Sequence, residues 1–281
     1  MLSNKIDFAV VFTVKNANPN GDPLLGNRPR QTSDGLGEVS DVCLKRKIRN
    51  RLQQMGEKIF VQMDSMCDDG MNSLSKRFEA FLKSKKAEDI SKAVCEEWFD
   101  VRAFGQVFAF KKREGVDEVS MGIRGPVTIQ PALSLEPVIM ESIQITKSVN
   151  SEPDESGKKS SDTMGMKHRV DYGLYRFNGS INPQLASKTG FSDEDAEAVK
   201  QALIHLFDND ASSARPEGSM EVVRVYWWKH NCRNGQYSSA KVHRTLSIVP
   251  KPGTIDPKDI SDYEFSLSDL DGLKPEVIDG E

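Results

Sequence analysis

The stretch "IDFAVVFTVKNANPNGDPLLGNRPR", residues 6–30, decides the fold because it sets a strand and a long turn before a helix. Its first nine residues are apolar and rich in β-branched side chains, which predicts a buried strand. Residues 16–38 are rich in asparagine, glycine and proline, and we expect them to form a loop. This loop carries Arg28 and Arg30, so the chain enters the next element with positive charge already beside it.

A basic amphipathic helix is predicted after this loop, capped by Ser40 or Asp41 and ending near Gly56. Its run "LKRKIRNR", residues 44–51, holds five basic residues and no acid. No acid stands between Asp41 and Glu57, so the usual i,i+4 ion pairs are missing from the helix interior. An apolar stripe at helical spacing would face the core, with the cations along its margins. The stripe consists of Leu44, Ile48, Leu52 and Met55.

The rest of the chain alternates further strands and helices. Strands are predicted at 100–110, 124–149, 169–182, 220–230 and 240–250, and helices within 57–100 and, capped by Ser192, at 192–210. Residues 150–168 are rich in serine, lysine and acids without periodicity, which is typical of a mobile loop. Without its insertions the order is β-α-β-β-α-β. We therefore predict an α+β fold of the ferredoxin-like type, which RNA-recognition domains share.

The overall composition favours a soluble globular protein. Of 281 residues, 37% are hydrophobic and 28% are charged, with a net charge of −4 and a pI near 5.7. No apolar run approaches the ~20 residues that a membrane span needs. The N-terminus lacks a signal-peptide cleavage pattern, so we expect a cytoplasmic protein without a membrane partner. A net acidic chain can still bind a phosphate backbone, because its cations are concentrated locally.

No catalytic, metal or cofactor site is predicted. The four cysteines and four histidines are scattered, with no metal-ligand spacing. The chain has no GxSxG, no GxxxxGK[ST] and no GxGxxG after a strand. Two alternatives stay open for the basic helix: a nucleic-acid backbone site or a solvated face. Arg102, Phe104 and Gly105 partly match an RNA-binding strand pattern, which an ordinary core strand explains as well.

A family resemblance bears on these alternatives. The segment "VSDVCLKRKIRN", residues 39–50, resembles the Ser-x-x-x-Leu-Lys-Arg-x-x-Arg helix start of the CRISPR RAMP proteins. The resemblance extends over nearly the whole chain and is closest to the repeated backbone subunit of a type I Cascade effector complex, most like type I-C. Its further segments are "NPNGDP", "NRPR", "DVRAFG", "GPVTIQPALSLEPV", "TMGMKHRVDYGLYRFNGSINP" and "SSARPEGSM".

This resemblance implies a non-catalytic CRISPR RNA-binding protein of antiviral defence. Copies of the subunit would form a helical filament on one crRNA, hold its backbone whatever its sequence, and present it to target DNA. Residues 1–281 would form one ferredoxin-like (RRM-like) palm, with helical fingers at about 55–97 and a β-hairpin thumb at about 136–172. Further partners would be the large subunit, the small subunit and the subunit that caps the RNA 5′ end.

The resemblance and the charge pattern together give a set of expected RNA contacts. Met164 and Met166 would act as apolar wedges between bases, and Lys167 and His168 would touch the displaced segment. The full set is Asn18, Asn20, Arg28, Arg30, Ser40, Lys45, Arg46, Arg49, Arg102, Phe104, Gly105, Met164, Met166, Lys167 and His168.

The alternative function is a RAMP-type endoribonuclease that cleaves CRISPR or target RNA. Type III relatives use a loop aspartate for this reaction, and Asp34 lies near the corresponding loop. A third possibility is an unrelated interaction protein. No second group that would activate a nucleophile is evident, so we predict no catalysis.

Overall fold

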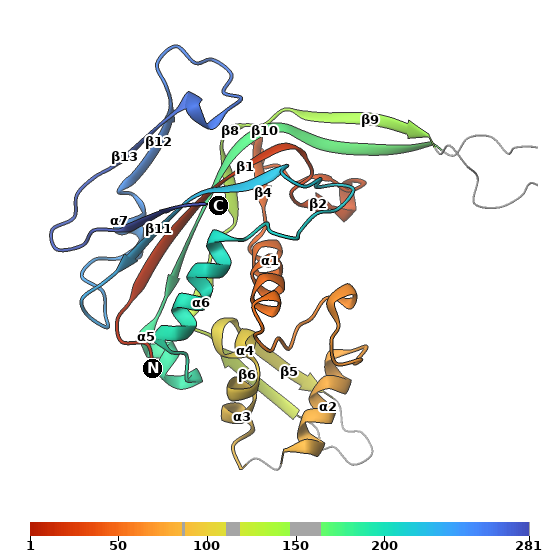
Figure 1. Ribbon diagram of the computed structural model, residues 1–281, viewed down its shortest axis with the longest axis vertical. Helices are drawn as coiled ribbons and strands as arrows, with labels where there is room; N and C mark the ends of the chain where they lie inside the picture. Colours follow the sequence, from red (N-terminus) through yellow and green to blue (C-terminus); the bar gives the residue numbers. More distant parts are fainter. Residues whose placement is uncertain (86–87, 111–118, 147–163, 281) are drawn as a thin grey trace, which may run out of the picture.

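The computed structural model describes residues 1–85, 88–110, 119–146 and 164–280. The protein has an α+β fold, built on an antiparallel sheet with helices on one face and a C-terminal segment on the other (Figure 1). Along the chain the core elements follow the predicted β-α-β-β-α-β order. None of the helices in these ranges is long and apolar enough to span a membrane.

The main sheet is organised around two long strands, β1 (Ile6–Ala17) and β10 (Met164–Ile181). They pair antiparallel, with Ile6 opposite Ile181. The strand order is β14-β11-β1-β10-β8-β4, and β7 and β9 also pair with β10. The other strands are β4 (Leu36–Val39), β7 (Val127–Ile129), β8 (Ala132–Pro137), β9 (Met140–Thr146), β11 (Met220–Lys229) and β14 (Glu276–Asp279).

Two helices cover one face of this sheet, α1 (Asp41–Gln54) and α6 (Asp193–Ile204). Ser40 caps α1 by accepting a hydrogen bond from the backbone N–H of Cys43, and Ser192 forms a capping box with Asp195 on α6. The predicted apolar stripe of α1 is buried, apart from Met55, which follows the end of the helix. Hydrogen bonds from Ser40 to Asn20 hold the N-terminus of α1 beside the loop that follows β1.

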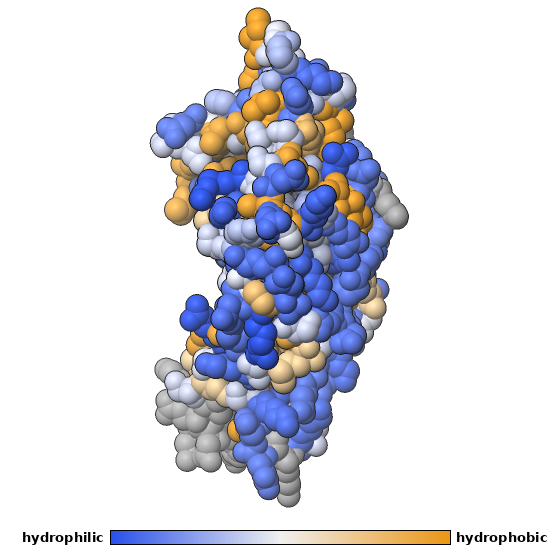
Figure 2. Space-filling view, turned by 90° about the vertical axis from the view of Figure 1, so that its left-hand side faces the viewer, coloured by the Kyte–Doolittle hydropathy of each residue, from blue (hydrophilic) through white to orange (hydrophobic). Residues whose placement is uncertain are grey.

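The C-terminal segment covers the other face of the sheet. It contains α7 (Ser239–His243), β12 (Leu246–Pro250) and β13 (Tyr263–Leu267), and it builds a second core with Trp228. Trp227, the neighbour of Trp228 on β11, is buried in the first core. Figure 2 views this side, where apolar residues gather toward the upper end and most of the remaining surface is hydrophilic. Both sheet faces are therefore occupied by protein.

An appended unit with its own core hangs below the sheet in Figure 1. It comprises α2 (Leu74–Ser84), α3 (Ile90–Glu97), α4 (Phe99–Phe104) and the hairpin of β5 (Gly105–Phe110) and β6 (Val119–Arg124). A 3₁₀ turn, Asp64–Met66, precedes them. Phe60, Phe78, Trp98 and Phe108 pack in a tilted arrangement against one another at its centre. Aromatic pairs of this kind add stability beyond their buried area.

A hairpin of β9 and the first half of β10 projects from the sheet at the upper right of Figure 1. In its register Met164 lies opposite Thr146 and Val170 lies opposite Met140. Most of its side chains are exposed or half-buried.

Several predicted boundaries were wrong. Residues 99–104 form α4 and not a strand, since Phe99 and Ala103 turn into the core and only the residues from Gly105 on are extended. The predicted strand at 240–250 begins with α7, and the helix predicted to reach residue 210 ends at Ile204.

Two predicted loops also contain regular structure. Residues 16–38 include β2 (Gly21–Asp22), the 3₁₀ turn Pro23–Leu25, β3 (Arg28–Pro29) and β4. Residues 164–168 of the predicted mobile loop belong to β10, because each pairs with a residue of β9. The remainder of that loop, residues 150–163, lies outside the described residues. The remaining elements are α5 (Pro183–Thr189) and the 3₁₀ turn Ile260–Asp262.

Candidate nucleic-acid interface

A hollow of about 400 Å³ lies where the loop after β1 meets the base of the β9–β10 hairpin. It brings together four of the predicted contact residues from segments almost 150 residues apart in the sequence. These are Asn18, Met166, Lys167 and His168. The lining residues are Asn18, Gly26, Asn27, Ile145, Met166, Lys167, His168, Ser213 and Ala214. The hollow is open, and more of its lining surface is apolar than polar.

Asn18 forms the buried wall of this hollow. Its backbone N–H donates to the Ala214 carbonyl at 2.9 Å, and its Nδ2 donates to the Asn27 carbonyl at 2.7 Å. The side chain is 3% exposed, yet its Oδ1 accepts no hydrogen bond from any described residue. An unpaired buried acceptor is costly, so this oxygen is a polar atom whose hydrogen-bonding capacity the described residues leave unused.

Asn20 and Ser40 join the loop to the N-terminus of α1. Asn20 Oδ1 accepts from the Ser40 N–H at 3.0 Å and from the Ser40 Oγ at 2.9 Å. The Arg30 N–H donates to the Asn20 carbonyl at 2.9 Å, and the Arg30 guanidinium lies 3.8 Å from Asp22. These side chains thus hold the shape of the loop, in addition to any contact they make with a ligand.

The free positive charge of this region comes from Arg28 and Lys167. Arg28 is exposed, Lys167 is half-buried, and neither forms an ion pair within the described ranges. His168 Nδ1 lies 2.8 Å from Ser142 Oγ, which orients its ring. Met166 and Met164 are 55% and 65% exposed, so two large apolar side chains stand at the surface of the hairpin.

The cations of α1 have partners, contrary to the expectation from the local sequence. Lys45 pairs with Asp41 at 3.0 Å, and Arg49 Nε donates to Asp100 at 2.9 Å. Arg46 donates to the Val61 carbonyl at 2.6 Å, and burial together with the nearby Arg49 lowers its pKa. Two further pairs are Lys47 with Asp210 and Arg51 with Asp208. These ion pairs could not be predicted from the local sequence, because most of the acids lie more than 50 residues away along the chain.

Cys43, on the first turn of α1, is the only cysteine close to this loop in the described part of the chain. Its Sγ lies 3.8 Å from the Pro19 carbonyl. Burial raises the pKa of the thiol, although the positive charge of Lys47 opposes the shift. The neutral thiol is a poor nucleophile and a poor metal ligand.

Arg102, Phe104 and Gly105 do not line the hollow. Arg102 forms a bidentate pair with Asp195, with its closest contact at 2.8 Å, and Phe104 lies under the Arg49 guanidinium at 5.0 Å. Gly105 has a φ of +79°, and a Cβ there would approach the Ile123 carbonyl oxygen to 2.3 Å. Each of the three residues therefore makes contacts that stabilise the fold. Their contact with RNA stays a prediction.

Sequence reasoning missed Asn27, Ile145, Ser213 and Ala214. Asn27 follows Gly26, and both adopt left-handed conformations, with φ of +61° and +64°. The asparagine–glycine content of the loop indicates such a turn, but no local sequence signal shows that the turn lies beside Ser213. The backbone hydrogen bond from Asn18 to Ala214 joins the two segments in the folded structure.

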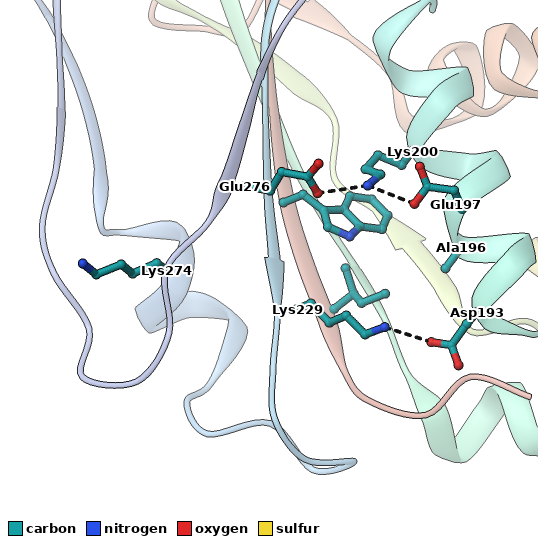
Figure 3. A pocket seen from close by; sticks show the side chains of 9 residues that line it. Asp193, Ala196, Glu197, Lys200, Lys229, Lys274 and Glu276 are labelled. Carbon is teal, nitrogen blue, oxygen red and sulfur yellow. Dashed lines mark hydrogen bonds and ion pairs between the residues drawn. The ribbon is translucent and has the colours of Figure 1, made fainter.

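A second hollow, of about 200 Å³, lies between α6 and the strands β11 and β14 (Figure 3). Lys200 Nζ lies 2.9 Å from both Glu197 and Glu276, above the ring of Trp227. Lys229 pairs with Asp193 at 3.3 Å, while Lys274 points away from the network in Figure 3. This site ties the C-terminal strand to α6, and the described residues include no cluster of His, Cys, Asp or Glu that could hold a metal.

Together, the antiparallel sheet, the appended helical unit and the open hollow define an α+β protein with an exposed surface site rather than an enclosed cleft. The chain belongs to the Cas7 family of CRISPR-associated proteins, because the family model of the CRISPR-associated protein Cas7 matches residues 4–268. The curated CRISPR-associated protein Cas7 of Haloferax volcanii is 26% identical over 251 residues, which cover 83% of this chain and 73% of that protein.

Two solved structures are also similar to this chain. A chain of a CRISPR RNA-guided surveillance complex in a pre-nicking state has a TM-score of 0.49 and 16% identity, covering 84% of this chain and 81% of its own. A chain of another CRISPR RNA-guided surveillance complex has a TM-score of 0.42 and 18% identity, covering 80% and 68%. Both TM-scores are below 0.5, and the family assignment rests on the sequence match.

Proposed function

We propose that this Cas7-family chain is a non-catalytic guide-RNA subunit of a type I-C Cascade-like complex in antiviral defence. Copies of the chain would form a helical filament along the RNA and present it for pairing with target DNA. In this proposal the sheet and its helices are a ferredoxin-like palm, residues of about 55–97, which include α2 and α3 of the appended unit, are the fingers, and the hairpin within about 136–172 is the thumb.

The observation that carries the proposal is the shared hollow. It combines a buried, unpaired acceptor on Asn18, a free cation on Lys167 and an exposed apolar side chain on Met166. Arg28 follows directly after the lining residue Asn27. A ribose 2′-hydroxyl can donate to Asn18 Oδ1, cations neutralise phosphates, and methionine can separate bases. These contacts use parts of RNA that every nucleotide shares.

The covered sheet supports sequence-independent binding. RNA-recognition domains stack bases on aromatic residues of an open sheet face. Here the C-terminal segment packs over that face and buries Tyr226 and Trp228. Bases cannot stack on this sheet face, so the RNA strand would be bound by the loop and the hairpin. A subunit that must accept any guide sequence requires binding of this kind.

The filament would place the thumb of one copy against its neighbour, and Met164 and Met166 would separate bases at the junction. The expected neighbours at the filament ends and along its side are the large subunit, the small subunit and the subunit that caps the RNA 5′ end. These partners follow from the family resemblance of the sequence.

The test is RNA content and salt dependence of the purified chain. Arg28→Gln with Lys167→Gln should lower the affinity for a 30-nucleotide RNA at every sequence tried. The slope of log K against log salt should fall by about 1.4, since each lost phosphate contact on a single strand accounts for about 0.7. Lys83→Gln with Lys251→Gln removes the same charge at exposed positions elsewhere and serves as the matched control.

A sequence-selective loss, or an unchanged slope in the first variant, would count against the proposal. The endoribonuclease alternative has its own test. Asp34 is exposed in the turn between Thr32 and Gly35. Site-specific cleavage of repeat or target RNA by the wild-type chain, abolished in Asp34→Ala, would establish the enzyme instead.

A further inference from the structure

Three long stretches of this acidic chain contain no acid. They are residues 119–135, 172–192 and 222–255, which hold one, two and six Arg or Lys residues respectively. In a chain with 42 acids, stretches of this length create a local excess of positive charge wherever the fold brings them together.

The fold brings them together around a polar basin of about 490 Å³. It lies at the end of β10 that is remote from the hairpin, between β6, α5 and the start of α7. Its walls are joined by a hydrogen bond from Gln184 Nε2 to Asn234 Oδ1 at 2.6 Å. The lining residues are Lys5, Arg124, Ser180, Asn182, Gln184, Leu185, Asn234 and Ser239, with no carboxylate among them.

Further cations surround the basin. Arg233 lies beside Asn234 and donates to the Pro183 carbonyl at 3.4 Å, which places it against α5. Arg244 follows His243, whose Nε2 lies 3.1 Å from the Gly179 carbonyl next to Ser180. Arg124, Arg233 and Arg244 are exposed, and none forms an ion pair with a residue that the structure describes.

Asp7, which lies beneath this surface, pairs with one lining cation, Lys5, and with none of Arg124, Arg233 and Arg244. Asp7 is fully buried, and its carboxylate already lies 3.2 Å from Lys5 Nζ and 2.9 Å from His230 Nε2. The contrast with α1 is direct, because there each lysine and most arginines face an acid. The uncompensated charge of the described chain is therefore greater here than on the helix that the sequence singles out.

The chemistry of the lining identifies the class of ligand. Protein interfaces are rich in aromatic residues, methionine and arginine at their centre and poor in lysine and serine. This basin offers hydroxyls, amides and guanidinium groups, with Leu185 as its one apolar side chain. Ser, Asn, Gln, Arg and Lys are the residues that contact phosphate and sugar in nucleic-acid complexes.

We propose that this basin is a second polynucleotide-binding surface, which holds the phosphate backbone of a strand or duplex other than the one at the hairpin hollow. The two sites lie on opposite ends of β10, with Met166 at one site and Ser180 at the other, about 45 Å apart along an extended strand. That the ligand is a second nucleic acid rests on the proposed function of the hollow.

The experiment measures binding of a fluorescein-labelled 30-bp DNA duplex to the purified chain, with any RNA that it carries, by anisotropy between 50 and 200 mM KCl. The test variant is Arg124→Gln/Arg233→Gln/Arg244→Gln. The control is Lys83→Gln/Lys251→Gln/Lys274→Gln, which removes the same charge from exposed residues outside the basin. Thermal unfolding checks that all proteins fold alike.

We expect the test variant to bind duplex at least tenfold more weakly at 100 mM salt and to lose about 2 to 3 units of salt slope, near 0.9 for each phosphate contact. The control variant should keep the wild-type affinity, and the absorbance ratio at 260 and 280 nm should show equal RNA content. The variant Arg28→Gln/Lys167→Gln of the hairpin hollow should show the reverse, with lower RNA content and unchanged duplex affinity. The results therefore distinguish a failure of the basin proposal from a failure of the proposed function.

Three results would overturn the basin. Wild-type protein that does not bind the duplex, equal losses in the test and control variants, or tighter binding of a poly-glutamate peptide than of the duplex would each exclude it.

Discussion

Arg49 donates a hydrogen bond from its Nε to Oδ2 of Asp100 across 2.9 Å, and the Asp100 side chain is 1% exposed. The same carboxylate accepts from the backbone N–H groups of Phe60 at 2.7 Å and Val61 at 3.1 Å. This carboxylate therefore fastens α1 to the segment that leads into the appended unit. One of the cations that the sequence assigns to RNA thus has a structural partner.

Replacing Asp100 should be strongly destabilising. Asp100→Ala leaves a half-buried guanidinium and two backbone N–H groups without their acceptor, and removal of one partner of a buried pair costs about 3–5 kcal/mol. Lys45→Ala breaks only the i,i+4 pair with Asp41 and should cost at most about 0.5 kcal/mol. Urea unfolding measures both free energies. Equal values for the two variants would show that the buried pair does not bind the units together.

Gly105 should prove a structural residue, because it joins α4 to β5 with a φ of +79°. A Cβ at this position would lie 2.3 Å from the Ile123 carbonyl oxygen, so Gly105→Ala should destabilise the protein by about 1–3 kcal/mol. Gly122, on the paired strand β6, has open space for a Cβ and makes the matched control. An Ala at Gly105 that leaves the melting temperature unchanged but weakens RNA binding would contradict this assignment.

His243 should make the protein less stable in mild acid. Burial lowers the pKa of His243 below 6.5, although Asp7 and the hydrogen bond to Gly179 act against the shift. The unfolded chain then binds a proton at a higher pH than the folded chain does. The neutral ring contributes its full stability above pH 6.5, and that stability is lost as the pH falls through the folded pKa, by at most about 1.4 kcal/mol per pH unit.

The free energy of unfolding in urea at pH 7.5, 6.5 and 5.5 measures this loss. His243→Gln keeps a side-chain donor for the Gly179 carbonyl and should flatten the dependence, whereas His168→Gln on the exposed hairpin should not. Asp7 does not interfere in this range. Burial acts to raise its pKa, but hydrogen bonds from His230 and Ser239 and the charge of Lys5 bring it below 3.8. An unchanged slope in His243→Gln would assign the acid sensitivity to another group.

The hairpin methionines should affect the spacing of exposed bases more than the affinity. Met164→Ser/Met166→Ser removes two apolar side chains that are 65% and 55% exposed. Because they make no phosphate contact, we expect the affinity for RNA to change less than threefold. The periodic reactivity of unstacked bases toward permanganate should be lost. Met55→Ser/Met63→Ser, at 39% and 41% exposure, should leave the pattern intact. Persistence of the pattern in the hairpin variant would refute the wedge.

Much of the fold could be predicted from local patterns. The apolar run of β1, the cap and stripe of α1 and the capping box at Ser192 are encoded by neighbouring residues, and each is present in the structure. Short elements were less predictable. Residues 99–104 and 239–243 form helices of one or two turns that exist only because their apolar side chains pack on distant partners, such as Phe99 on Phe191.

For the candidate site, the sequence correctly drew attention to the loop after β1 and to residues 164–168. It could not reveal that they share a hollow with residues 213–214, or that Asn18 would be buried with an unpaired oxygen. The contacts that create the hollow span about 150 to 200 residues, and periodicity carries no information over such separations.

The sequence by itself determined the long strands and helices, such as β1, α1 and α6, and the number of cations, because propensity, capping and hydrophobic spacing act between residues a few positions apart. Which cations remain free was decided only by the tertiary structure. Asp100 and Asp210 are brought to Arg49 and Lys47 from 51 and 163 residues away, and their charge is neutralised there. Arg124, Arg233 and Arg244 meet no such acid among the described residues, since the stretches that carry them contain none and no carboxylate lines the basin where they converge.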